Sequence, residues 1–80
     1  MSQFEKLVKK LLRKPQMTFE ELERIVLSKE VGFKLLRIRG SHHIYRKGVR
    51  TIILTKHSGN VDGAYIQNVI DLLEDMGLIK

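Results

Sequence analysis

Two adjacent histidines, His42 and His43, lie inside the stretch RIRGSHHIYRKGVR, which spans residues 37–50. Five of these fourteen residues are Arg or Lys, and none is Asp or Glu. An imidazole can take a proton from a hydroxyl group, and guanidinium groups can hold a phosphate and stabilise the charge that develops on it. The stretch therefore has the residue types for acid–base chemistry on an anionic substrate. A solvated basic hairpin would have the same composition and is the alternative.

The positive charge of the chain is concentrated around these histidines. The net formal charge is +6 over 80 residues. Residues 31–61 hold seven Lys or Arg and no acid, residues 1–30 hold seven basic and five acidic residues, and residues 62–80 hold one basic and four acidic residues. A field of this sign attracts polyanions such as RNA, DNA, acidic lipid or an acidic protein. We expect a polyanion to bind the middle third of the chain.

Metal and cofactor chemistry is not expected. The chain has no Cys, which excludes disulfides and thiolate metal sites. No carboxylate lies between Val31 and Val61, so a zinc or magnesium ion near the histidines would lack ligands. No Ser-His-Asp arrangement suggests itself. The stretch SGNVDG is not followed by the Lys-Ser/Thr of a phosphate-binding loop.

The N-terminal stretch MSQFEKLVKKLLRK lacks the apolar region of a signal peptide, and no apolar run is long enough to span a bilayer. We therefore expect a cytoplasmic protein with no membrane partner, folded as a single domain over residues 1–80. The first segment is amphipathic and basic, which would also suit a membrane surface. Its apolar residues follow helical spacing and are more simply explained by packing on the domain: Phe4, Leu7, Val8, Leu11 and Leu12.

Three helical segments are predicted. The first ends before Pro15, because a proline cannot continue the helical hydrogen bonds. Thr18 and Glu21 have the spacing of a capping box, which predicts a second helix from Thr18 to about Val31 with Gly32 as its stop. The third runs from Ala64 to Met76, and Gly77 ends it.

From Phe33 the apolar period changes to two, which is typical of strands. Gly40-Ser41 and Lys47-Gly48 predict tight turns, and VRTIILT is a β-branched third strand. The order is α-α-β-β-β-α. It predicts an α+β fold, a two-layer sandwich in which helices cover one face of a three-stranded antiparallel sheet.

The first hairpin separates the two histidines. With Gly40-Ser41 as the loop, the expected pairs are Arg39–His42, Ile38–His43, Arg37–Ile44 and Leu36–Tyr45. Successive side chains point to opposite faces, so the helix-facing set is Leu36, Ile38, His43 and Tyr45, and the uncovered set is Arg37, Arg39, His42, Ile44 and Arg46. We therefore expect His42 to be open to a ligand and His43 to be half-buried and bonded to a backbone carbonyl. His57 is expected in a loop or capping role, with a supporting role at the site left open.

The stretch GFKLLRIRGSHHIYRK, followed by TIILTKH and a helix ending in GLI, resembles the HicA toxin family, messenger-RNA interferases of type II toxin–antitoxin systems. The similarity covers roughly residues 17–80, and residues 1–16 form an extra N-terminal helix. It implies a fold like the double-stranded-RNA-binding domain, metal-independent ribonuclease activity, an mRNA substrate and a HicB-type antitoxin partner. The resemblance makes His42 the catalytic residue, Gly40 the motif glycine and Ser41 a positioning residue.

The sequence and the resemblance both point to His42 and to a polyanionic substrate, which the resemblance implies is RNA. His42 would take the proton of a ribose 2′-hydroxyl or activate water. The RNA-contacting set is expected to be Arg37, Arg39, Gly40, Ser41, Arg46 and Lys47. A non-catalytic RNA-binding module with the same basic sheet face is the alternative from another class, and a degenerate toxin that only binds its antitoxin is a third.

Overall fold

The computed structural model describes residues 2–13, 16–56 and 61–79, and the order of its elements is the predicted α-α-β-β-β-α. The helices are α1 (Gln3–Arg13), α2 (Phe19–Leu27) and α3 (Gly63–Asp75). The strands are β1 (Lys34–Arg39), β2 (His42–Lys47) and β3 (Arg50–Thr55). The predicted α+β class is confirmed.

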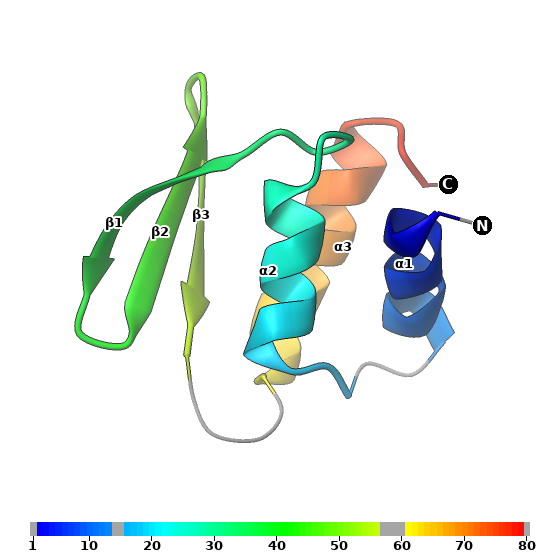
Figure 1. The fold of residues 1–80 in the computed structure, drawn as a ribbon, viewed down its shortest axis with the longest axis horizontal. Helices are drawn as coiled ribbons and strands as arrows, with labels where there is room; N and C mark the ends of the chain where they lie inside the picture. The colour runs from blue at the N-terminus through cyan, green and yellow to red at the C-terminus, as the bar shows by residue number, and fades with distance from the viewer. Residues whose placement is uncertain (1, 14–15, 57–60, 80) are drawn as a thin grey trace.

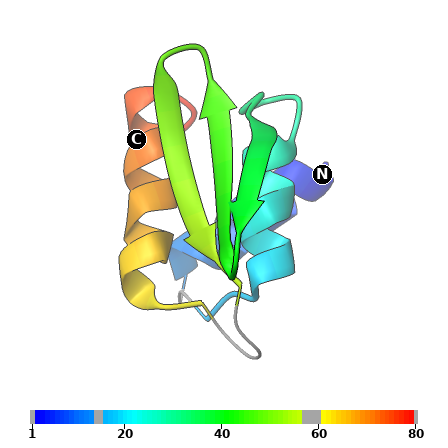
Figure 2. The ribbon, with the colours of Figure 1, turned by 90° about the vertical axis from the view of Figure 1, so that its left-hand side faces the viewer.

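The three strands form one antiparallel sheet in the order β1-β2-β3, and the helices cover only one of its faces. Helices α2 and α3 lie side by side against the sheet, and α1 packs on their far side (Figure 1). After a turn of 90° that brings the sheet to the front, the sheet stands before the helices and no described element covers it (Figure 2). The expected open face is therefore present, and α1 adds a further helix behind the two that support the sheet.

The core lies between the sheet and α2 and α3. Strands β2 and β3 contribute Tyr45, Ile52 and Leu54, which are buried. The Tyr45 hydroxyl donates a hydrogen bond to the Glu23 carboxylate of α2 at 2.5 Å. Burial, reinforced by this carboxylate, raises the pKa of Tyr45. The phenol therefore stays protonated and ties the middle of the sheet to α2.

Helix α2 begins as predicted and ends earlier than predicted. The Glu21 amide donates to Thr18 Oγ1 at 3.2 Å and the Thr18 amide donates to Glu21 Oε1 at 3.0 Å, which completes the capping box. The predicted end near Val31 is wrong, since the helix stops at Leu27. The Ser28 amide and hydroxyl both donate to the Ile25 carbonyl, at 3.2 and 2.6 Å, and such local bonds compete with the helical ladder.

Helix α1 packs on the domain through one side. Val8 and Leu11 are buried against the core, whereas Leu12, which the sequence placed on the same stripe, is 51% exposed. Lys10 Nζ lies 2.6 Å from Glu21 Oε2, which joins α1 to the start of α2. Within the described ranges, no helix has the length and apolar character needed to cross a membrane.

The hairpin register agrees with the prediction at three pairs and departs from it at the fourth. Arg39–His42, Ile38–His43 and Arg37–Ile44 are paired as expected. Tyr45 pairs with Leu35 rather than Leu36, because a bulge between Leu35 and Arg37 inserts an extra residue into β1. The prediction that Leu36 faces Tyr45 was wrong, since strict alternation allows no extra residue. All six residues of β1 are exposed, so the helices leave this edge strand largely uncovered.

Candidate functional site

His42 is the first residue of β2 and its side chain is exposed. It lies opposite Arg39 of β1 on one side and Thr55 of β3 on the other. Tyr45 and Ile52 face the helices, so the alternation of β2 puts His42 in the set that points to the uncovered face. Both the register and the exposure therefore agree with the predicted position of His42.

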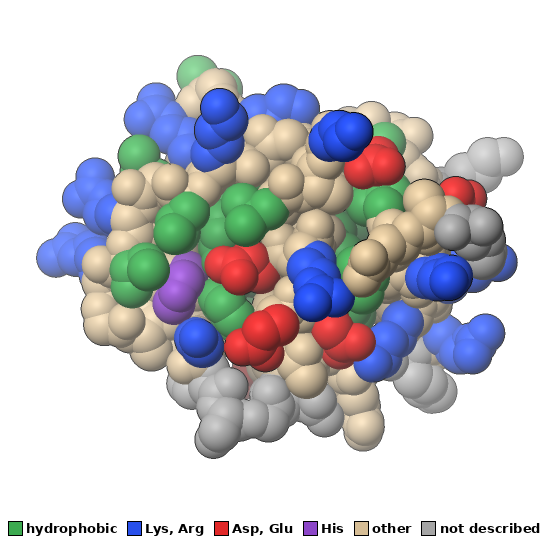
Figure 3. Space-filling view, in the orientation of Figure 1, with side chains coloured by type: hydrophobic (Ala, Val, Ile, Leu, Met, Phe, Trp, Pro, Cys, Tyr) green, Lys and Arg blue, Asp and Glu red, His purple; other side chains and the backbone are tan. Residues whose placement is uncertain are grey.

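Cationic side chains surround His42 on this face of the sheet. The paired positions form three rows across the sheet, which are Arg39–His42–Thr55, Arg37–Ile44–Ile53 and Lys34–Arg46–Thr51. The four cations of these rows are all exposed. Figure 3 shows Lys and Arg side chains along the outer edge of the sheet, whereas the Asp and Glu side chains on the same view lie over the helices. We call the residues of these rows the basic sheet face.

Gly40 and Ser41 form the loop between His42 and Arg39. Gly40 has a φ of +61°, and Ser41 is not among the residues with positive φ, which is the pattern of a type II′ turn with glycine at its first central position. The Ser41 carbonyl accepts from the Lys56 amide at 2.8 Å, which fixes the loop to the chain after β3. The loop thus holds the two strands in the register that sets Arg39 beside His42.

Arg46 and Lys47, which the sequence assigned to the same site, lie on opposite faces. Arg46 is on the basic sheet face, and its Nε donates to the Gly48 carbonyl at 2.7 Å, which leaves its terminal amino groups for a ligand. Lys47 reaches to the helix side, where its Nζ donates to the Val31 carbonyl at 3.0 Å. The structure therefore does not bring Lys47 together with His42.

His43 has the structural role expected of it. Its ring meets the Phe19 ring edge-on, with centroids 4.7 Å apart, and Nδ1 lies 3.4 Å from the Ser41 carbonyl oxygen. This contact places the ring between the hairpin loop and the start of α2. The expectation for His57 concerns a residue outside the described ranges.

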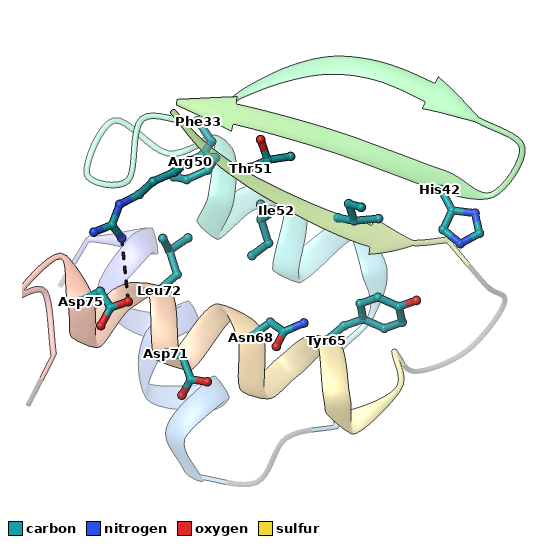
Figure 4. A pocket seen from close by; sticks show the side chains of 11 residues that line it. Phe33, His42, Arg50, Thr51, Ile52, Tyr65, Asn68, Asp71, Leu72 and Asp75 are labelled. Atoms are coloured by element: carbon teal, nitrogen blue, oxygen red, sulfur yellow. Dashed lines mark ion pairs between the residues drawn. The ribbon is translucent and has the colours of Figure 1, made fainter. Parts of the chain in front are cut away.

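A groove of about 680 Å³ runs between β3 and α3 (Figure 4). His42 and Tyr65 lie at one end and Arg50 and Asp75 at the other. The Thr55 hydroxyl, whose residue is 4% exposed, donates to the Tyr65 hydroxyl at 2.7 Å. This bond joins α3 to the strand position opposite His42. The imidazole is therefore reached both from the basic sheet face and from the groove.

The opposite end of the groove is closed only loosely. Arg50 Nη1 lies 4.0 Å from Asp75 Oδ2, and both side chains are about half exposed or more. An ion pair this long and this exposed contributes little stability. A ligand can therefore separate the two side chains at small cost.

Sequence reasoning did not find the residues of α3 that line the groove. Tyr65 and Asn68 carry no motif, and the periodicity of α3 says only that they are not part of its main apolar stripe. The sequence placed the second turn at Lys47-Gly48, which would pair His42 with Ile53. The structure has this loop at Gly48-Val49, so Thr55 lies opposite His42 instead. What the sequence does not supply is the docking of α3 beside the free edge of β3.

The donor atoms of the site suit an anion better than a metal ion. No group of three or more His, Asp or Glu side chains comes together anywhere in the described ranges. Of the two side chains paired with His42, the Thr55 hydroxyl is buried and donates to Tyr65, and the exposed Arg39 guanidinium is free to face a ligand. A guanidinium donates hydrogen bonds to phosphate oxygens.

No family model, curated protein or solved structure matches this chain. The resemblance to the HicA family therefore rests on the residues of the hairpin and its flanking strands. The function has to be argued from the arrangement around His42.

Proposed function

We propose that the chain is a metal-independent endoribonuclease, the toxin of a type II toxin–antitoxin system of the HicA kind. The observation that carries this proposal is the exposed pairing of His42 with Arg39 on the uncovered sheet face. A general base needs reach to its substrate, and a phosphoryl transfer needs cations at the phosphate. We include in this proposal the fold that the family resemblance implies, which is that of the double-stranded-RNA-binding domain.

His42 acts as the general base of the cleavage. It accepts the proton of a ribose 2′-hydroxyl while that oxygen attacks the adjacent phosphorus, or it accepts a proton of water that attacks in the same way. The bond from phosphorus to the 5′-oxygen breaks, and the leaving oxygen takes a proton from solvent or from an acid at the site. Each proton that moves is therefore taken up by His42 or supplied by the solvent or an acid at the site.

The arginines contact two different phosphates of the RNA. Arg39 is directly opposite His42, and side chains so paired have Cβ atoms about 5 Å apart, so both reach one phosphate. Arg46 is four residues from His42 along β2, which is about 13 Å at the usual rise per residue. Arg46 therefore holds a different phosphate and fixes the direction of the RNA across the sheet. Arg37, one row from Arg39, lies between the two.

An acidic protein of the HicB kind is the proposed inhibitor. The basic sheet face carries four exposed cations with no acid among its paired positions. A protein that covers it has to bring carboxylates, because guanidinium groups buried without a counter-charge are costly. Such a partner masks His42 directly. A small gene for an acidic protein next to the gene of this chain would support this part of the proposal.

The experiment that tests the function compares binding with cleavage. Purified protein is incubated with a mixed-sequence RNA in excess chelator, and the products are separated on native and denaturing gels. A ribonuclease of this type shortens the RNA. An RNA that shifts on the native gel and stays intact on the denaturing gel would indicate the non-catalytic binding module instead.

A further inference from the structure

An RNA strand that presents a phosphate to His42 can extend from there in two directions. One is along the basic sheet face, past Arg39 and Arg37. The other is into the groove between β3 and α3, which has His42 at its end (Figure 4). The two surfaces differ in charge and shape, and this difference decides which part of a nucleotide each can hold.

The basic sheet face and the groove carry opposite charges, so they suit different parts of a nucleotide. The basic sheet face attracts phosphates. The α3 wall of the groove carries the carboxylates of Asp71 and Asp75, and the one Lys or Arg among the groove's described lining residues, Arg50, lies near Asp75. A phosphate would be repelled by this wall, whereas a nucleobase is uncharged and is not. A nucleotide bound at His42 would therefore place its phosphate on the basic sheet face and its base in the groove.

The groove offers a base both an apolar contact and polar partners. Ile53 of β3 and Leu72 of α3 supply apolar surface, and Asn68 and Asp71 supply an amide and a carboxylate on α3. A volume of about 680 Å³ lies in the range of small-molecule sites. Asp71 Oδ1 already accepts from Gln67 Nε2 at 2.9 Å, which orients the carboxylate, and both Asn68 and Asp71 are exposed.

A carboxylate accepts hydrogen bonds and cannot donate them. It pairs with the amino groups of cytosine, adenine or guanine. Uracil has no amino group, and its one ring donor on that edge, N3–H, lies between two carbonyl oxygens that repel a carboxylate. We propose that the groove between β3 and α3 binds the unpaired nucleobase adjacent to the phosphate held at His42, with Asn68 and Asp71 selecting bases that carry an amino group. This inference rests on the proposed function, whose substrate preference it specifies.

Nucleotide binding tests the groove without any cleavage. The backbone amide signals of the wild-type protein are followed by NMR during titration with AMP, CMP, GMP, UMP and ribose 5-phosphate. Ribose 5-phosphate has the phosphate without a base and should shift signals only on the basic sheet face. AMP, CMP or GMP should also shift the signals of Asn68, Asp71 and Leu72, which line the groove on α3 and lie outside the basic sheet face, and at least one should bind about fivefold or more tightly than UMP. Shifts confined to the basic sheet face with all four nucleotides would overturn the proposal.

Two acidic positions of α3 provide a matched pair of variants. Asp71→Asn replaces the carboxylate in the groove, whereas Glu74→Gln makes the same change on an exposed residue that does not line it. Asp71→Asn should lose the discrimination against UMP, and Glu74→Gln should keep it. Equal discrimination in both variants would show that Asp71 does not read the base.

Sequencing of the products from a random RNA separates the two proposals. Wild-type cuts should be enriched beside bases with an amino group, and Asp71→Asn should flatten this bias. If the RNA stays intact while the groove still discriminates between nucleotides, the proposed ribonuclease activity is refuted and the proposed base-binding site stands. Cleavage without base bias and without groove shifts would refute the base site alone.

Discussion

His42 on β2 and Arg39 on β1 face each other across the first hairpin, at the pair that closes the Gly40-Ser41 loop. The loop is two residues long and Gly40 adopts a positive φ of +61°, so the register at this pair is set locally. An imidazole and a guanidinium are thereby held side by side on a face that no described element covers (Figure 2). The proposed chemistry depends on this one relationship.

RNA affinity should depend on salt through Arg37 and Arg39. Each phosphate that a cation neutralises releases counterions, so the double change Arg37→Ala/Arg39→Ala should lower the slope of log affinity against log salt by up to about two. Binding is measured between about 50 and 200 mM salt. The control is the double variant Lys6→Ala/Arg13→Ala. It removes two cations of α1, which lies on the far side of α2 and α3 from the sheet, and should leave the slope close to that of the wild type. A salt-independent affinity of the wild type would contradict polyanion binding.

Lys47 should matter for stability more than for RNA. Its Nζ bonds the Val31 carbonyl after α2, so Lys47→Ala should lower the free energy of unfolding by about 1 kcal/mol and the melting temperature by a few degrees. Because the side chain reaches to the helix side, RNA affinity should fall less than in Arg39→Ala. Thermal melting and an RNA titration of both variants check this. A loss of affinity in Lys47→Ala as large as in Arg39→Ala, with unchanged melting, would place Lys47 in the interface instead.

The link between α1 and α2 should weaken in acid. The hydrogen bond from Lys10, with that from the Thr18 backbone, holds the pKa of Glu21 below its ordinary value of 4.5. A carboxylate whose pKa is lower in the folded state stabilises the fold above the unfolded value and loses this effect as pH falls through the folded one. Glu21→Gln should therefore melt below the wild type near neutral pH, and the difference should shrink below pH 4.5. A difference of equal size at both ends of the range would exclude the ionised Glu21 as its cause.

His43→Ala should lower stability without removing the chemistry. The edge-on contact with Phe19 would be lost, and aromatic pairs of this kind contribute about 0.5–1.5 kcal/mol beyond their burial. Cleavage per folded molecule should stay close to that of the wild type. Melting curves give the stability of both proteins, and a cleavage assay at a temperature where both are folded gives their cleavage rates. Wild-type melting combined with lost cleavage would reverse the roles given to the two histidines.

Local rules predicted most of the fold. The capping box of Thr18 and Glu21, the turn at Gly40-Ser41 and the alternation after it depend on residues close in sequence, and the structure confirms all three. The same rules therefore placed His42 and Arg39 together on the open face.

The departures come from contacts that sequence spacing does not contain. A bulge moved Leu35 into the place expected for Leu36, and Ser28 ended α2 by bonding Ile25 before the predicted stop. Lys47 was assigned to the RNA contacts because it is basic and adjoins Arg46. Its side chain instead reaches to the helix side, where its Nζ donates a hydrogen bond to the Val31 carbonyl. The groove beside His42 exists only because α3 docks along β3, which is a tertiary contact that no motif encodes.

The central claim is that His42 is the general base, and one assay tests it most directly. Wild type and His42→Ala are incubated with RNA in excess chelator, and RNA binding and thermal melting are measured on the same samples. His42 is exposed, so the substitution should change stability by only about 0.5 kcal/mol and leave the arginines to bind RNA. We predict that the wild type cleaves in chelator and that His42→Ala binds the RNA, melts within a few degrees of the wild type and does not cleave. Cleavage by His42→Ala at the wild-type rate, or none by the wild type in chelator, would contradict the account.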